Sequence, residues 1–247
     1  MKKLLTWKLI LITIFILASF LRFYALDKIP ASLNPDEAAL GYTSFSFLHT
    51  GADEHGVLFP ISLQSFGDWK LPGYSYVSLI PIGLFGLSSF SVRITSALAG
   101  VMGVLLIYYI SLNLFKRKDI AIVSALFYTL SPWSIYFSRA SYEVNLATTF
   151  FLSGLAAFIK YANTKENKTK WLILSTILFA ITLFTYHSYI IFTPVFLLGL
   201  IYLNKDWIKV NLKFLMPLFI FAGVALISLY ASVFNSASKT STLLVFN

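Results

Sequence analysis

Two adjacent carboxylates, Asp36 and Glu37, follow the first apolar segment of the chain and could supply a general base. Charge beside lipid is costly, so an acidic pair at this place needs a reason. A carboxylate in such a loop can take a proton from an attacking hydroxyl. The run Asn34-Pro35-Asp36-Glu37 is also a good helix start, because Asn caps a helix and acids are favoured in its first turn. The two interpretations do not exclude each other.

Basic residues follow that could meet a phosphate. Arg139 lies four residues before Glu143, a spacing typical of a surface ion pair, but also of a phosphate-binding arginine held by a carboxylate. Lys70 ends the run Asp68-Trp69-Lys70, which resembles an interfacial anchor. In a functional interpretation Lys70 lies near a lipid phosphate, and Asp68 lies near a metal ion or an acceptor. Both alternatives stay open for each motif.

The histidines are less informative. His187, set between two tyrosines, fits a structural role better than a ligand role, although its expected level near the outer face would let it donate to a phosphate. The run Asp53-Glu54-His55 could offer metal ligands, but consecutive residues rarely converge on one ion. A solvated loop is therefore favoured there, and the requirement for a divalent metal stays unknown.

These residues need a scaffold, and composition says which kind. Hydrophobic residues make up 58% of the 247, charged residues 12%, and the mean hydropathy is +0.79. Such values predict an all-α membrane protein. The net charge of +9 fits the lysines and arginines of cytoplasmic loops, so no nucleic-acid partner is expected. Cysteine is absent, which excludes disulfides and thiolate metal sites.

Hydropathy predicts about seven transmembrane helices, since about 20 apolar residues cross a bilayer. They are expected at about 7–26, 94–115, 120–137, 144–160, 171–188, 189–203 and 213–234. The first is taken as an uncleaved span, and residues 1–247 are taken as one transmembrane module.

The apolar stretch 71–90 is interpreted as interfacial helix. If it crossed the membrane, Lys116-Arg117-Lys118 and the lysines of 160–170 would lie outside, against the positive-inside rule. With 71–90 in the interface, the N-terminus is inside and 27–93 forms a long first extracytoplasmic loop with interfacial helices. The candidate residues above then gather on one face of a multi-pass protein of the cell membrane.

The same residues carry a resemblance. An acidic pair after the first span, Gly67-Asp68 shortly before Pro72, Arg93 at the head of the next span, and a Ser-Arg-x-x-x-Glu turn ending at Glu143 resemble the membrane-embedded GT-C glycosyltransferases. The nearest branches are the dolichyl-phosphate-mannose protein mannosyltransferases and the bacterial aminoarabinose lipid A transferases. The resemblance covers about 5–203.

That resemblance implies a polyprenyl-phosphate-linked sugar donor and a protein, lipid or glycan acceptor outside the cytoplasm. It implies that Asp36 is the catalytic base with Glu37 beside it, and that Arg139 organises the donor phosphate or the loop. Lys70 and His187 are further candidates for the phosphate, and direct displacement would invert the sugar. No cofactor is expected with certainty, although a divalent metal could assist.

Two other classes remain. A transporter or flippase for lipid-linked substrates would carry ionisable residues within its spans, whereas here they sit at the outer ends. An inactive scaffold derived from a truncated transferase would retain Asp36 without activity. Because relatives of this kind usually run to several hundred residues, the chain is expected to be the N-terminal half of a longer enzyme.

Overall fold

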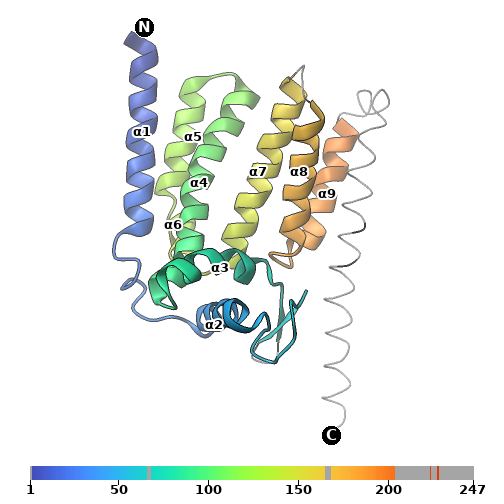
Figure 1. Cartoon of the computed structure of the whole chain (residues 1–247). Helices are drawn as coiled ribbons and strands as arrows, with labels where there is room; N and C mark the ends of the chain where they lie inside the picture. Colours follow the sequence, from blue (N-terminus) through green and yellow to red (C-terminus); the bar gives the residue numbers. More distant parts are fainter. Residues whose placement is uncertain (1, 66–67, 165–167, 204–222, 224–226, 228–247) are drawn as a thin grey trace, which may run out of the picture.

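The computed structural model describes residues 2–65, 68–164 and 168–203, together with 223 and 227. Its upright helices run alternately up and down beside one another (Figure 1). These are α1 (Lys2–Phe23), α4 (Ser89–Phe115), α5 (Lys118–Leu130), α7 (Glu143–Asn163), α8 (Lys168–Leu183) and α9 (Tyr189–Leu203). The architecture is that of an all-α membrane protein.

Three described helices are long and apolar enough to cross a membrane, namely Thr6–Phe23, Ser89–Phe115 and Glu143–Asn163. A bent pair of helices, Lys118–Leu130 and Pro132–Ser138, brings the number to as many as four. The expected spans at 171–188 and 189–203 are the shorter apolar helices Thr169–Leu183 and Tyr189–Leu200. The expected span at 213–234 lies outside the described residues.

The span expected at 120–137 is a bent pair of helices rather than one continuous helix. The chain bends by 58° between α5 and α6 (Pro132–Ser138). Proline has no backbone N–H and its ring clashes with the preceding turn, so a helix tends to end before it. Ser131 then caps the new helix, its hydroxyl accepting a hydrogen bond from the backbone N–H of Ser134 at 3.4 Å.

One end of the bundle carries a platform, defined as α2 (Pro35–Thr50), the hairpin of β1 (Leu63–Ser65) and β2 (Asp68–Lys70), and α3 (Gly73–Phe85). Helix α3 lies across the end of the upright helices and does not run along them (Figure 1). The expectation that 71–90 does not form an upright span is therefore confirmed in the bundle's geometry.

The platform is joined to the bundle by close backbone contact. The backbone N–H of Gly73 donates to the carbonyl of Phe184 at 2.9 Å, linking the start of α3 to the end of α8. A Cβ atom at Gly73 would lie 2.7 Å from that same carbonyl oxygen, so only glycine permits the approach. The residues after β2 are thus held against the end of the bundle.

Aromatic side chains fill the core between α7, α8 and α9. The rings of Phe151 and Phe179 lie edge to face with centroids 5.3 Å apart, and both side chains are buried. Gly154 lets the Phe179 ring approach α7 closely, since a Cβ there would meet it at 3.1 Å. Edge-to-face packing adds about 0.5–1.5 kcal/mol to the burial of such rings. This core fixes α8, whose end holds the platform.

Candidate active site

The acidic pair divides into one buried and one exposed carboxylate. Glu37 is 2% exposed, and its two oxygens accept from the guanidinium of Arg93 at 3.0 and 3.2 Å. They also accept from the backbone N–H groups of Ser141 at 3.0 Å and Asn34 at 3.1 Å. The Asn34 side chain accepts in return from the backbone of Glu37, which completes a capping box. The predicted helix start is confirmed.

This geometry corrects the expectation that Glu37 shares the catalysis. A carboxylate that is buried, ion-paired and fully hydrogen-bonded has no free lone pair facing a substrate. Glu37 has a structural role instead. It joins the platform to α4 through Arg93 and to the α6–α7 turn through Ser141. Glu37 is therefore a positioning residue in this fold.

Arg93 uses all five of its N–H groups. Two bonds go to Glu37, and the others go to the carbonyls of Leu26 at 3.1 Å, Pro30 at 2.9 Å and Ser32 at 2.8 Å. The planar guanidinium suits this fork-like set of acceptors. The connection between α1 and α2 is thereby wrapped around one side chain that is 0% exposed.

Arg139 does not pair with Glu143. Its guanidinium donates to the carbonyls of Leu21 at 2.9 Å, Tyr24 at 2.7 Å and Ile29 at 2.9 Å. Partial burial and the nearby charge of another guanidinium lower the pKa of Arg139. The expectation that Glu143 holds Arg139 is therefore wrong. Of the two roles expected for Arg139, the contacts show it organising the loop.

Asp36, the second carboxylate, faces solvent. Its side chain is 65% exposed, and Oδ1 is ion-paired with the ammonium of Lys70, which is only 14% exposed. Oδ2 has no hydrogen-bond partner among the described residues. Asp36 lies on the first turn of α2, which fixes its backbone at the start of the helix. Asp36 thus combines a fixed position with one open oxygen.

His187 and Glu143 join this pair. The Nε2 atom of His187 lies 3.0 Å from the carbonyl oxygen of Trp69, in the residue before Lys70. A carbonyl only accepts, so Nε2 carries the proton and Nδ1 is left as the ring's second polar atom. Glu143, the first residue of α7, lies near enough to Lys70, Asp36 and His187 for their charges to be felt at its carboxyl group, which is itself largely buried. Four predicted site residues therefore gather at the platform.

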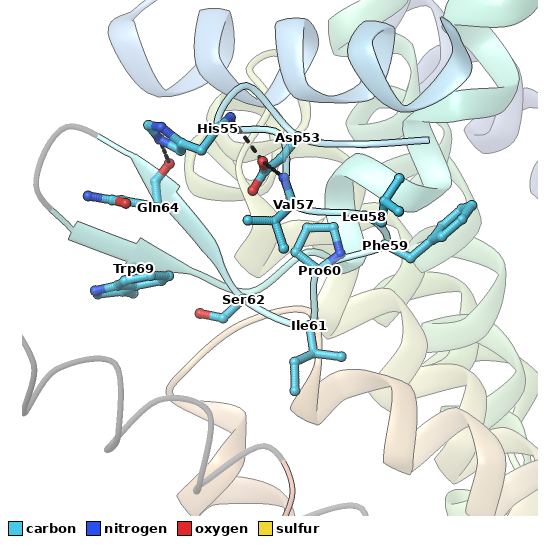
Figure 2. Close-up of a pocket in the computed structure, with 10 residues that line it drawn as sticks. All are labelled: Asp53, His55, Val57, Leu58, Phe59, Pro60, Ile61, Ser62, Gln64 and Trp69. Carbon is cyan, nitrogen blue, oxygen red and sulfur yellow. Dashed lines mark hydrogen bonds between the residues drawn. The ribbon is translucent and has the colours of Figure 1, made fainter. Parts of the chain in front are cut away.

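The hairpin that carries Lys70 is shown in Figure 2. Lys70 pairs with Leu63 across the two strands, and Asp68 pairs with Ser65. The side chain of Asp68 lies outside the described residues, so its predicted role stays a prediction. On the other side of β2, the Trp69 ring lines a pocket of about 420 Å³.

The nearby run Asp53-Glu54-His55 builds a turn. Asp53 is 7% exposed, and its Oδ1 accepts from the backbone N–H groups of His55 and Val57, each at 2.9 Å (Figure 2). Within the described ranges no group of three or more acidic, histidine or cysteine side chains could hold a metal ion. The hydrogen bonds of Asp53 agree with the predicted loop, and the requirement for a metal stays a prediction.

Two features escaped the analysis of the sequence. The phenols of Tyr136 and Tyr142 lie 2.8 Å apart at the α6–α7 turn, and this bond together with burial raises the pKa of Tyr142 to about 12. Arg22 in α1 is 0% exposed and donates to Ser134 at 2.8 Å and Ser138 at 3.3 Å. The sequence did contain a signal for Arg22, because a single arginine near the end of an apolar helix needs buried partners. Arg22 joins α1 to α6 beside the platform.

An upright helical bundle with a polar site at one end, built from the first loop and the later helix turns, is the architecture of a GT-C membrane glycosyltransferase. The family model for dolichyl-phosphate-mannose-protein mannosyltransferase matches residues 70–230, and the chain belongs to this family. Asp36 and Glu37 precede the matched segment. A search of curated protein sequences finds no significant match.

Solved structures resemble this fold over nearly the whole chain. The crystal structure of ArnT from Cupriavidus metallidurans in the apo state has a TM-score of 0.69 at 13% identity, covering 96% of this chain and 44% of that one. The same protein bound to undecaprenyl phosphate has a TM-score of 0.64 at 14% identity, covering 93% and 42%. The chain therefore spans less than half the length of the structures it matches.

Proposed function

We propose that the chain forms the base-bearing part of a glycosyltransferase that moves a sugar from a polyprenyl-phosphate-linked donor to an acceptor hydroxyl. The observation that carries the proposal is the pairing of Asp36, open at Oδ2, with Lys70 at the end of the bundle. Membership of the mannosyltransferase family supports the reaction class, and an undecaprenyl phosphate complex of a similar fold supports the type of lipid.

In the proposed reaction Asp36 takes the proton of the acceptor hydroxyl as its oxygen attacks the anomeric carbon. The bond between that carbon and the lipid phosphate oxygen breaks, and the polyprenyl phosphate leaves as an anion. Direct displacement inverts the configuration of the sugar. A positioned base of this kind contributes about 10²–10⁴ in rate.

The leaving phosphate needs cations. Lys70 has three N–H donors, so it can hold Asp36 and still offer a proton to a phosphate oxygen. His187 is held next to Lys70 by its bond to the Trp69 carbonyl, so it is a second candidate to contact the same anion. Because the described residues offer no metal cluster, no step is assigned to a divalent ion.

The charge of the loops indicates the side of the membrane. The turn between α4 and α5, at the end opposite to Asp36, carries Lys116, Arg117 and Lys118. Positive loops stay in the cytoplasm. We therefore propose that the Asp36 end is extracytoplasmic and that acceptors are glycosylated outside the cytoplasm.

A transporter is the second class to weigh. Transporters place ionisable groups near the membrane midplane. In the described upright helices the fully buried charged residues are Arg22 and Arg93. Both lie near the platform end, and both hold neighbouring segments rather than line a path. This arrangement favours an enzyme. An inactive scaffold would keep the same architecture, so activity must be measured.

The test uses membranes from cells producing the chain and a radiolabelled sugar on undecaprenyl phosphate. Asp36→Asn should lower transfer about 100-fold or more while the protein still binds the lipid. Asp27→Asn, an exposed acid in the same loop, is the matched control and should retain transfer. Full activity of Asp36→Asn would refute the assignment of the base.

A binding measurement separates the lipid from the chemistry. Purified chain should bind undecaprenyl phosphate, and Lys70→Met should weaken that binding while Asp27→Asn does not. Binding without transfer in the wild-type chain would support the scaffold alternative. Absence of binding would contradict the proposed donor class.

A further inference from the structure

A groove of about 390 Å³ opens on the side of the bundle between α4, α7 and α8. It is lined by Leu106 and Tyr109 of α4, by Leu174 and Leu178 of α8, and by residues of α7 that include Ser153 and Ala157. It lies toward the end opposite to the platform, since α7 starts at the platform with Glu143 and the groove ends at Lys160. It is therefore separate from the candidate active site.

The shape of the groove suits one hydrocarbon chain. Small residues on α7 leave room between the bulkier side chains of its two neighbours. From Ser153 to Lys160 the helix rises about 10 Å, at 1.5 Å per residue. That is about a third of the 30 Å hydrocarbon core, which fits the upper part of an acyl chain in a single leaflet.

Two cations lie beside the Trp171 ring, which lines the groove together with Lys160. The ammonium of Lys160 lies 5.9 Å from the centroid of the Trp171 ring, and that of Lys170 lies 5.5 Å from the same centroid. Both lysines are exposed, and neither forms an ion pair with any residue that the structure describes. Two cations beside one indole, near helix ends that are expected at the headgroup level, can attract an anion.

We propose that this groove binds one anionic glycerophospholipid, with an acyl chain between α4 and α8 and the phosphate at Lys160 and Lys170. The headgroup charge should determine which lipid binds more tightly. A zwitterionic headgroup places its own cation near the two lysines, whereas an anionic headgroup does not. Lysines near anionic lipid strengthen binding about fivefold each. The site belongs to the leaflet opposite to Asp36, so it is independent of the proposed transfer reaction.

The test is a native mass spectrometry titration of the purified chain in detergent. Phosphatidylglycerol and phosphatidylcholine with identical acyl chains are compared, and inorganic phosphate serves as a headgroup without a chain. The wild-type protein should retain phosphatidylglycerol at least fivefold more tightly than phosphatidylcholine. The double variant Lys160→Gln/Lys170→Gln should lose about 25-fold in affinity for phosphatidylglycerol.

Matched variants separate charge from shape. Lys8→Gln/Lys118→Gln removes two exposed lysines outside the groove and should leave the affinity unchanged. Ser153→Leu fills the groove from a partly exposed position and should weaken both lipids, with folding checked by melting without lipid. Equal affinity for the two lipids, an unaffected lysine double variant, or inorganic phosphate binding as tightly as phosphatidylglycerol would each overturn the proposal.

Discussion

The ion pair between Arg93 and Glu37 should be the most sensitive point of the fold. Arg93→Met leaves a carboxylate that is 2% exposed without its cation, and it also frees three loop carbonyls. Removing one partner of a buried pair costs about 3–5 kcal/mol. Glu37→Gln keeps an acceptor for the helix cap but leaves Arg93 buried and unpaired, at about 3 kcal/mol.

The double variant separates the pair from its surroundings. Arg93→Met/Glu37→Gln removes both buried charges at once, so its cost should fall short of the sum of the single costs by about 2–3 kcal/mol. The loop carbonyls stay unpaired, which prevents full recovery. Such coupling would show that the two side chains stabilise the platform as a unit.

Thermal unfolding of the purified protein in detergent measures these effects. For a chain of this size about 1 kcal/mol moves the melting temperature by roughly 2–4 °C, so Arg93→Met should lower it by at least about 6 °C. Arg117→Met is the control, because its ion pair with Asp119 is exposed and should matter little. A melting temperature of Arg93→Met within 2 °C of wild type, or strict additivity in the double variant, would refute the reasoning.

Two further predictions concern packing and topology. Gly100→Ala should destabilise the chain by about 1–3 kcal/mol, because a Cβ there would overlap the Ser138 hydroxyl beside Arg22, and an unchanged melting temperature would contradict this contact. In a chain without native cysteine, a membrane-impermeant thiol reagent added to intact cells should label Glu54→Cys but not Arg117→Cys; labelling at 117 would reverse the topology.

Local signals predicted several parts of the site. The Asn-Pro-Asp-Glu run gave the start of α2, because caps and first-turn acids act within a few residues. The distribution of lysines predicted that 71–90 does not stand upright in the bundle, as α3 shows. Asp36, Lys70, Glu143 and His187 were named separately and lie together.

The partners of those residues were harder to predict. Glu37 meets Arg93 from 56 residues away, and Ser141 from 104 residues away, and no local pattern encodes such distances. The role of Arg139 depends on carbonyl oxygens, which every residue type has, so sequence carries no mark of its acceptors. The bend before Pro132 did have a signal, but the apolar run around it favoured one continuous span.

Arg93 contacts residues that lie far before it in the sequence, and this separation has a consequence for biosynthesis. Glu37 leaves the ribosome well before Arg93, and Arg93 leaves it before Ser141. The Glu37 carboxylate therefore lacks these two hydrogen-bond donors until the later segments are synthesised. The segment from Leu26 to Ser32 has nothing to wrap around until α4 has entered the membrane. A chain interrupted before α4 would carry every residue of the platform but lack the arginine that joins it to the bundle.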